Sequence, residues 1–191
     1  YRFLMPAAPK HLLLILLVFS PAIFTAGLVH HKAVDVGCWD MWENAPLLQK
    51  WHELRAGKMS WSDFGRDLYS AQIQHRIVVP RLLIIGLTHL SGGDFRWEQY
   101  FTFLILLLDA GLLWMLVRRS LGESPWRWPL MFGINLLVFS PIHYQILFWG
   151  ASMWGTIPIA CLLGVLVLLG APRGKGFWWR VIVATVLAEI A

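Results

Sequence analysis

The stretch YSAQIQHRIVVPRLL (69–83) places His75, Arg76 and Arg81 at the edge of, and inside, an apolar run. An arginine at the centre of a membrane helix costs about 2.5–3.5 kcal/mol on insertion scales, so a partner that offsets this cost is expected. Basic side chains at headgroup depth are suited to hold the phosphate of a lipid, because arginine offers paired N–H donors. We therefore treat these three residues as candidate phosphate-binding residues, with anchoring of the segment at the membrane surface as the alternative.

Carboxylates in DVGCWDMWEN form the second candidate group: Asp35, Asp40 and Glu43. Asp40 and Glu43 are three residues apart and would share one face of a helix. A carboxylate here is able to act as a general base toward an incoming hydroxyl, or to hold a divalent metal ion through its oxygens. The alternative is a solvated loop with ordinary acids at a helix N-terminus.

Two more polar features interrupt the apolar runs. The sequence SPIHYQILFWG carries His143, Tyr144 and Gln145, which we treat as candidate contacts from a second outer loop, with an ordinary capped turn as the alternative. Asp109 lies in the middle of FTFLILLLDAGLLWMLV. Because a charge at the bilayer centre is costly when unpaired, we expect Asp109 to make a structural hydrogen bond between helices.

The composition decides the class of protein that positions these residues. Of the 191 residues, 58% are hydrophobic, 14% are charged and 12 are Trp, whereas soluble domains carry about 25% charged residues. Trp favours membrane–water interfaces, where its ring is half buried and its N–H stays hydrated. The sequence therefore predicts an all-α, polytopic transmembrane protein in a lipid bilayer. The net charge of +5 is better explained by basic cytoplasmic loops than by nucleic-acid binding.

Apolar runs of about 17–25 residues are long enough to cross a bilayer as helices. We expect a single transmembrane domain over 1–191, which we take as the N-terminal part of a longer protein. The run 77–90 is too short, because its helix would reach about 21 Å and the hydrocarbon core is about 30 Å thick. We expect it to be re-entrant or interfacial. The predicted spans are 12–29, 101–117, 128–141, 154–171 and 177–191, with an outer loop at 30–76.

The basic residues of the loops indicate whether 77–90 crosses, since cytoplasmic loops are enriched in Lys and Arg. If every apolar run spans, the N-terminus lies opposite both basic loops. If 77–90 does not cross, the N-terminus and both loops fall on one side, which is the topology that we choose. The alternative has six spans and an outer N-terminus. The residues concerned are Arg2 and Lys10, then Arg118, Arg119 and Arg127, and then Arg173, Lys175 and Arg180.

The outer loop is expected to contain two short helices. The stretch NAPLLQKWHELRAG (44–57) has Pro46 at a first helical position and Gly57 at the stop, and SWSD (60–63) is typical of a capping box. The first helix has an apolar face, which favours a helix lying flat on the bilayer, and packing on a small subdomain is the alternative. That face consists of Leu47, Leu48, Trp51 and Leu54.

The order of these features, with WDMWENAPLLQKWHELRAGKMSW and QHRIVVPRLL, resembles the membrane-embedded glycosyltransferases of the GT-C superfamily, and more narrowly a set of bacterial membrane proteins with that architecture. The resemblance implies sugar transfer from a polyprenyl-phosphate-linked donor to an acceptor on the outer side of the cytoplasmic membrane. It also implies that Asp40 is the catalytic base or a ligand of a divalent metal, with Glu43 and Asp35 as further candidates. Arg76 and Arg81 would then hold the donor phosphate.

Two functions remain open from the sequence. The first is the glycosyl transfer just described, and the second is a non-catalytic role as part of a transporter or as a lipid-binding scaffold. Transporters usually place their polar sites near the bilayer midplane on broken helices. Here the polar residues, apart from Asp109, gather at one predicted surface, which favours the transferase.

Overall fold

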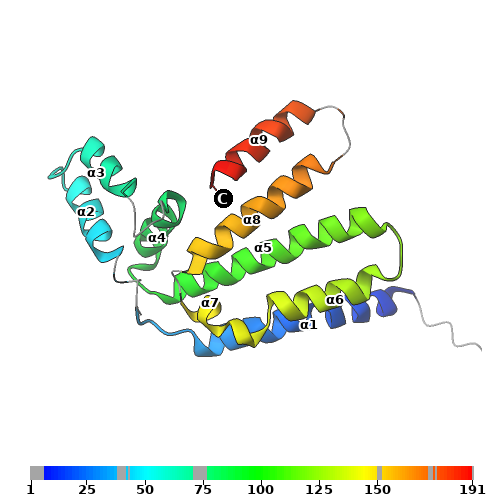
Figure 1. The fold of residues 1–191 in the computed structure, drawn as a ribbon. Helices are drawn as coiled ribbons and strands as arrows, with labels where there is room; N and C mark the ends of the chain where they lie inside the picture. The colour runs from blue at the N-terminus through cyan, green and yellow to red at the C-terminus, as the bar shows by residue number, and fades with distance from the viewer. Residues whose placement is uncertain are drawn as a thin grey trace, which may run out of the picture.

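The computed structural model describes residues 7–37, 42, 44–70, 77–149, 152–171, 174 and 176–190, and this part of the chain is helical, without a strand (Figure 1). The all-α class predicted from the sequence is therefore confirmed. The elements are α1 (Ala7–Lys32), α2 (Ala45–Arg55), α3 (Trp61–Leu68), α4 (Val78–Ser91), α5 (Arg96–Leu121), α6 (Arg127–Val138), the 3-10 helix η2 (Pro141–His143), α7 (Tyr144–Phe148), α8 (Met153–Leu169) and α9 (Phe177–Ile190).

Three segments among the described residues are long and apolar enough to cross a membrane. They are Leu12–Lys32 in α1, Arg96–Leu121, which is α5, and Arg127–Phe148, which joins α6, η2 and α7. α4 and α8 are shorter apolar helices. The five runs predicted as spans coincide with α1, α5, α6, α8 and α9, and the short run at 77–90 is α4. These helices indicate a membrane protein.

The polarity of the bundle is the reverse of that of a soluble protein. Thr25, Gln99 and Asn135 are fully buried, at 0% exposure, while many large apolar side chains are exposed. Polar residues that face the bundle interior are typical of helices whose outer surface contacts lipid. The exposed apolar residues include Leu13 and Phe24 in α1, Leu104 and Leu108 in α5, Leu162 in α8 and Trp178 in α9.

Two of these buried polar side chains join α1 to α6. Thr25 Oγ1 donates a hydrogen bond to the carbonyl of Phe139 at 2.7 Å, and Asn135 Nδ2 donates to the carbonyl of Val18 at 2.8 Å. Phe139 follows the last residue of α6, where backbone carbonyls have lost their helical partners. The hydroxyl of Thr25 in α1 therefore supplies a donor to a backbone carbonyl at the C-terminal end of α6.

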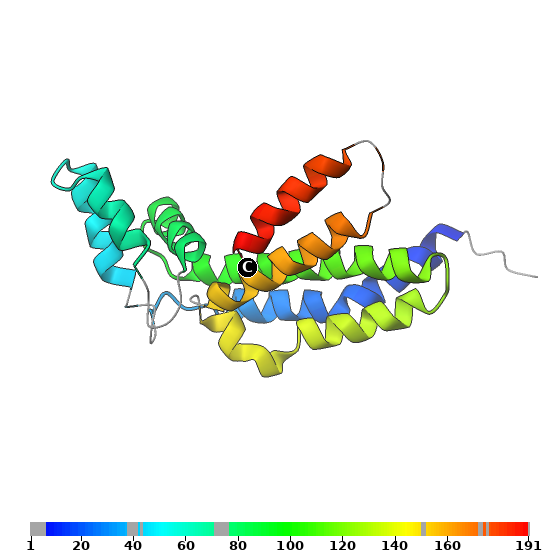
Figure 2. The same ribbon diagram turned by 45° about the horizontal axis from the view of Figure 1, so that its top comes forward.

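The two ends of the bundle carry different elements (Figures 1 and 2). The start of α1, the α5–α6 turn, the end of α8 and the start of α9 lie at one end. The other end, which we call the α4 end, carries α2, α3, α4 and α7. The start of α1 and the two connections that carry the basic residues thus lie at one end of the bundle, as the distribution of Lys and Arg favours. Which side of a membrane each end faces stays a prediction.

α4 stays at the α4 end because its apolar side chains are covered there. Ile84, which is 2% exposed, packs in one cluster with Ile105 of α5 and with Met153 and Ile157 of α8. Gly92 ends the helix with φ +69°, the left-handed conformation that glycine adopts without strain. The chain therefore turns at Gly92 and Gly93 and enters α5 a few residues later.

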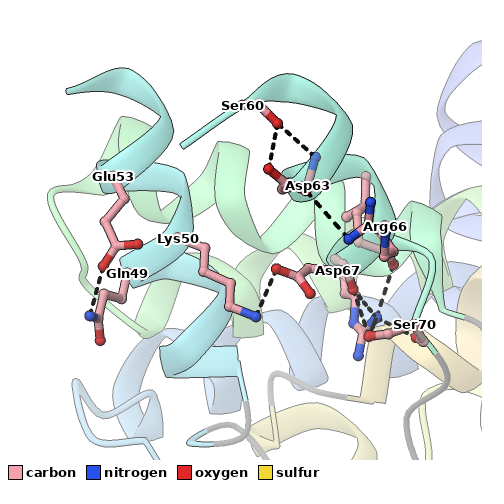
Figure 3. Close-up of polar contacts among 10 residues, drawn as sticks. Gln49, Lys50, Glu53, Ser60, Asp63, Arg66, Asp67 and Ser70 are labelled. Atoms are coloured by element: carbon pink, nitrogen blue, oxygen red, sulfur yellow. Dashed lines mark hydrogen bonds and ion pairs between the residues drawn. The ribbon is translucent and has the colours of Figure 1, made fainter. Parts of the chain in front are cut away.

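α2 and α3 pair beside α4. Pro46 lies in the first turn of α2, and Ser60 caps α3 by accepting the amide of Asp63 at 3.1 Å, both as predicted (Figure 3). An ion pair of 2.8 Å between Lys50 Nζ and Asp67 Oδ2 joins the two helices on their polar side (Figure 3). The pair is partly exposed, so its contribution to stability is small.

The apolar face of α2 is covered by protein. Leu47 and Leu54, each 7% exposed, pack in one cluster with Phe64 and Leu68 of α3 and with Ile85 of α4. Leu48 and Trp51 pack against the same cluster and are partly buried. Of the two arrangements left open by the sequence, the structure favours packing on a small subdomain over a helix that lies flat on lipid.

We predict that α4 does not cross the membrane. In a chain with Cys38 and Cys161 replaced by Ala, single cysteines from Ser62→Cys in α3 and Leu90→Cys at the end of α4 should both react with a membrane-impermeant maleimide added to intact cells. Ser120→Cys, at the end of α5, is the control and should react only after permeabilisation. The physical reason is that both ends of α4 lie at the same end of the bundle.

The outcomes of this labelling separate two errors. Reaction of position 90 only after permeabilisation, with position 62 reactive in intact cells, would show that α4 crosses. Reaction of position 120 in intact cells, with 62 and 90 both protected, would reverse the orientation of the whole bundle.

Candidate functional site

Arg81, in the first turns of α4, is bound to the end of α3. Its Nη1 donates hydrogen bonds to the carbonyls of Leu68 at 2.9 Å, Ser70 at 2.6 Å and Asp67 at 3.3 Å. The residue is 9% exposed. These carbonyls belong to the last residues of α3 and to the turn after it, as the neighbourhood of Asp67 and Ser70 in Figure 3 shows.

This contact explains why an arginine stands in an apolar helix. The last carbonyls of a helix lack intrahelical partners and carry a partial negative charge. A guanidinium has donors and no acceptor, so one nitrogen can serve several carbonyls at once. Burial lowers the pKa of Arg81, and an arginine remains charged even so. The cost of burial is therefore offset by capping α3.

The candidate phosphate-binding residues are not brought together by the described contacts. Nη1 of Arg81 is occupied by backbone carbonyls, whereas His75 and Arg76 lie outside the described residues. A role of Arg81 in phosphate binding stays a prediction, and it has to be reconciled with the capping of α3.

The structure joins the chain after α1 to the start of α5 through Asp35. Asp35 Oδ1 accepts the amide of Phe95 at 2.9 Å, across 60 residues of sequence. Asp94 and Arg96 lie beside it, with Arg96 Nε and Nη2 at 2.7–3.0 Å from the Asp94 carboxylate. We call Asp35, Asp94 and Arg96 the junction cluster, which lies at the α4 end.

The charges of the junction cluster are coupled. The Arg96 guanidinium, through its hydrogen bonds, holds the pKa of the Asp94 carboxyl below its usual value. Asp94 is therefore ionised at neutral pH and mainly positions Arg96. Asp35 is exposed, so its carboxylate is the one that an incoming hydroxyl could reach.

Two buried polar residues, Glu98 and Gln99, stand in the first turn of α5 directly after the junction cluster in sequence. Gln99, at 0% exposure, donates from Nε2 to the carbonyl of Val34 at 2.9 Å. Glu98 is 5% exposed. It precedes Thr102 by four residues and Ile105 by seven, which places it on the face of α5 that packs against α8.

Sequence reasoning missed Asp94, Glu98 and Gln99. Their stretch, DFRWEQY, directly precedes an apolar run, and acids at that position are common because they favour a helix N-terminus. One feature of the sequence could have identified Asp94 and Arg96. They stand at the start of a predicted span, where charged side chains are costly unless they are paired, so a pairing between them could have been expected.

Of the predicted catalytic residues, Asp35 is described, whereas Asp40 and Glu43 lie outside the described residues. Trp42, which stands between them in sequence, donates from Nε1 to the carbonyl of Gly37 at 3.0 Å. Its ring lies 5.8 Å from that of Phe95, the residue after Asp94. A Cβ at Gly37 would come within 2.9 Å of Phe95, so glycine is required for this approach.

The candidate residues of the second loop lie at the α4 end but apart from the junction cluster. His143 ends η2, and Tyr144 and Gln145 begin α7; all three are exposed. Gln145 Nε2 lies 3.4 Å from the Tyr144 hydroxyl. Within the described residues, the contacts of these side chains do not reach Asp35 or Arg96.

Asp109 does not make the hydrogen bond that was expected. It is 4% exposed, and its Oδ1 has no hydrogen-bond partner among the described residues. Its electrostatic neighbour on α8 is Cys161. Asp109 is therefore a buried carboxyl group, and the expected hydrogen bond from its Oδ1 to another helix is not found among the described residues.

A groove of about 410 Å³ lies between α4 and α5, next to the junction cluster. Asp94 and Arg96 form its polar part, and the rest of its lining is aromatic or aliphatic: Leu87, Trp97, Tyr100, Phe101 and Leu104. Such a lining suits a ligand with a polar head and an apolar chain.

A metal ion stays an open alternative. In the part of the chain that the structure describes, no three His, Cys, Asp or Glu residues are grouped to hold one. Asp40 and Glu43, the predicted metal ligands, lie outside that part.

No protein-family model, curated protein or solved structure matches this chain. The geometry of the α4 end is therefore the main indication of its function.

We predict that Arg81→Ala loosens α3. It leaves the buried carbonyl of Leu68 without the donor that Arg81 supplies, which costs about 1–3 kcal/mol. Amide hydrogen exchange of 61–70, measured by mass spectrometry on the protein in detergent, should become roughly ten- to hundredfold faster, because each 1.4 kcal/mol is a factor of ten.

Arg66→Ala is the matched control for this measurement. The Arg66 side chain is 78% exposed, and its ion pair with Asp63 has a distance of 3.4 Å, so its loss should change the free energy of unfolding by less than about 0.5 kcal/mol. Equal exchange in Arg81→Ala and wild type would remove the capping role of Arg81.

Proposed function

We propose that the chain is part of a membrane glycosyltransferase of GT-C type. It would move a sugar from a polyprenyl-phosphate-linked donor to an acceptor at the α4 end, on the outer side of a bacterial cytoplasmic membrane. The observation that carries the proposal is the pair Asp94 and Arg96, held beside Asp35, at the polar part of a groove whose remaining lining is aromatic or aliphatic.

The roles follow from the chemistry of these groups. A carboxylate removes the proton from the acceptor hydroxyl, and Asp40 is the first candidate, with Asp35 and Glu43 next. Arg96 faces the groove with its guanidinium about half exposed, where it is suited to stabilise the negative charge that develops on a phosphate leaving group. The apolar lining accommodates the first units of the lipid chain.

A lipid-binding scaffold without catalysis is the second candidate. The groove between α4 and α5 favours it equally, because lipid binding needs the groove and Arg96 but no base. The two functions differ in what removal of the carboxylates does. A scaffold keeps lipid binding without them, whereas a transferase loses turnover.

The test is transfer by the full-length protein in proteoliposomes supplied with a radiolabelled polyprenyl-phosphate sugar and candidate acceptors. Asp40→Asn should lower turnover by about 10²–10⁴-fold, the usual contribution of a general base, with donor binding unchanged. Asp35→Asn and Glu43→Gln are measured beside it. Asp63→Asn, an exposed acid of α3, is the control and should leave turnover unchanged.

Two results would contradict the proposal. One is turnover by all three carboxylate variants at the wild-type rate. The other is binding of the lipid donor without transfer to any acceptor by the wild-type protein, which would support the scaffold.

A further inference from the structure

A second cavity lies on the other side of α4, between that helix and α2. It has a volume of about 350 Å³, and we call it the α2–α4 pocket. Leu48, Trp51 and Ile85 form its apolar floor. Its remaining described lining is His52, Thr88, His89, Gly92 and Gly93, and none of the described lining residues is an acid.

The polar side chains that line the α2–α4 pocket are His52, Thr88 and His89, and Arg55 lies beside the pocket in contact with His89. Arg55, in the last turn of α2, has Nη1 at 3.3 Å from His89 Nδ1. Because arginine only donates, Nδ1 of His89 accepts, and the imidazole proton lies on Nε2. His89 therefore keeps an N–H donor, and Arg55 keeps further N–H groups. Both residues are exposed, so a ligand can reach them.

The backbone beside the pocket adds little opposing charge. α2 and α4 both end there, and free C-terminal carbonyls would repel an anion. The carbonyl of His52 accepts from the amide of Ala56, and that of Thr88 accepts from the amides of Gly92 and Gly93. The carbonyls of His52 and Thr88 are thus engaged, and the cationic side chain of Arg55 opposes the negative end of the α2 dipole.

We propose that the α2–α4 pocket binds a phosphate group, with Arg55, His52, His89 and Thr88 as its donors. A charged guanidinium together with neutral N–H and O–H donors suits the oxygens of a phosphate. The phosphate comes either from a lipid, whose first carbons would lie on Leu48 and Ile85, or from a soluble phosphorylated compound.

The position of the pocket connects it with the junction cluster. Gly92 and Gly93 line the pocket, and Asp94 is the next residue. The left-handed φ angles of the two glycines, +69° and +96°, make the tight turn that separates the two cavities. The inference goes beyond the proposed function, because it places a second phosphate site on the other side of α4 from the groove in which Arg96 would meet the donor phosphate.

The experiment measures binding of two probes to the purified full-length protein in nanodiscs of phosphatidylcholine, by isothermal titration. The probes are inorganic phosphate and decyl phosphate. Arg55→Ala and His89→Ala should each weaken binding by about ten- to hundredfold, because a hydrogen bond to a charged group contributes about 1.5–3 kcal/mol. Arg66→Ala, an exposed arginine of α3, is the matched control and should bind as wild type does.

The results decide both the site and its ligand. At least tenfold tighter binding of decyl phosphate than of inorganic phosphate supports a lipid source, and equal binding supports a soluble one. Equal affinity of Arg55→Ala, His89→Ala and wild type, or no binding of either probe, overturns the proposal. Arg55 and His89 are exposed, and melting temperatures within about 2 °C of wild type verify that the variants are folded.

Failure of the proposed function would look different. In that case phosphate binding would still depend on Arg55 and His89, and the lipid-linked donor would still bind, but no sugar would be transferred in proteoliposomes. The α2–α4 pocket would then stand as a phosphate site, and the transferase proposal would be wrong.

Discussion

The arrangement of the α4 end depends on the contact between the Arg81 guanidinium and the last carbonyls of α3. α2 is attached to α3 by apolar packing and by the Lys50–Asp67 ion pair, and α3 is attached to α4 by Arg81 and by apolar packing on Ile85. Hydrophobic contacts alone are not directional, so they would leave the angle between the α2–α3 pair and α4 poorly fixed. The walls of the α2–α4 pocket belong to α2 and α4, which means that its shape is set by a residue that does not line it.

A second set of contacts fixes the opposite side of α4. Asp35 and Gln99 join the chain after α1 to the first turn of α5 by two hydrogen bonds that span 60 and 65 residues. They hold the junction cluster against the groove between α4 and α5, while the turn at Gly92 and Gly93 leads directly into Asp94. The hydrogen-bond donors of the α2–α4 pocket therefore lie on one side of the turn at Gly92 and Gly93, and the carboxylates of the junction cluster lie on the other side. Phosphate binding and proton removal are separate tasks, and this turn would bring them next to each other.

Features that depend on local sequence could be predicted, and features that depend on distant partners could not. The lengths of the apolar runs, Pro46 at the start of α2 and Ser60 at the start of α3 are local properties, and each is found where expected. The partners of Arg81 are backbone carbonyls, which carry no side-chain identity that a sequence could reveal. The apolar face of α2 predicts burial but does not tell protein from lipid, and here it meets Phe64 and Ile85. Asp94 was missed because its pairing with Arg96 is indistinguishable in sequence from an ordinary helix start.

The location of the charges bears on the choice between transferase and transporter. Transport sites near the midplane need several polar groups to replace the hydration of their cargo. Asp109 is the acid in the middle of α5, and no group of three metal-ligating side chains surrounds it in the described residues. Its neighbour is Cys161, a thiol that offers a weak donor. At the α4 end, by contrast, two cavities border Asp94, Arg96 and His89. Cavities and charged groups coincide at the α4 end of the bundle, whereas Asp109, among the described residues, lies alone in the middle of α5, and this favours the proposed transfer at the α4 end over passage through the bundle.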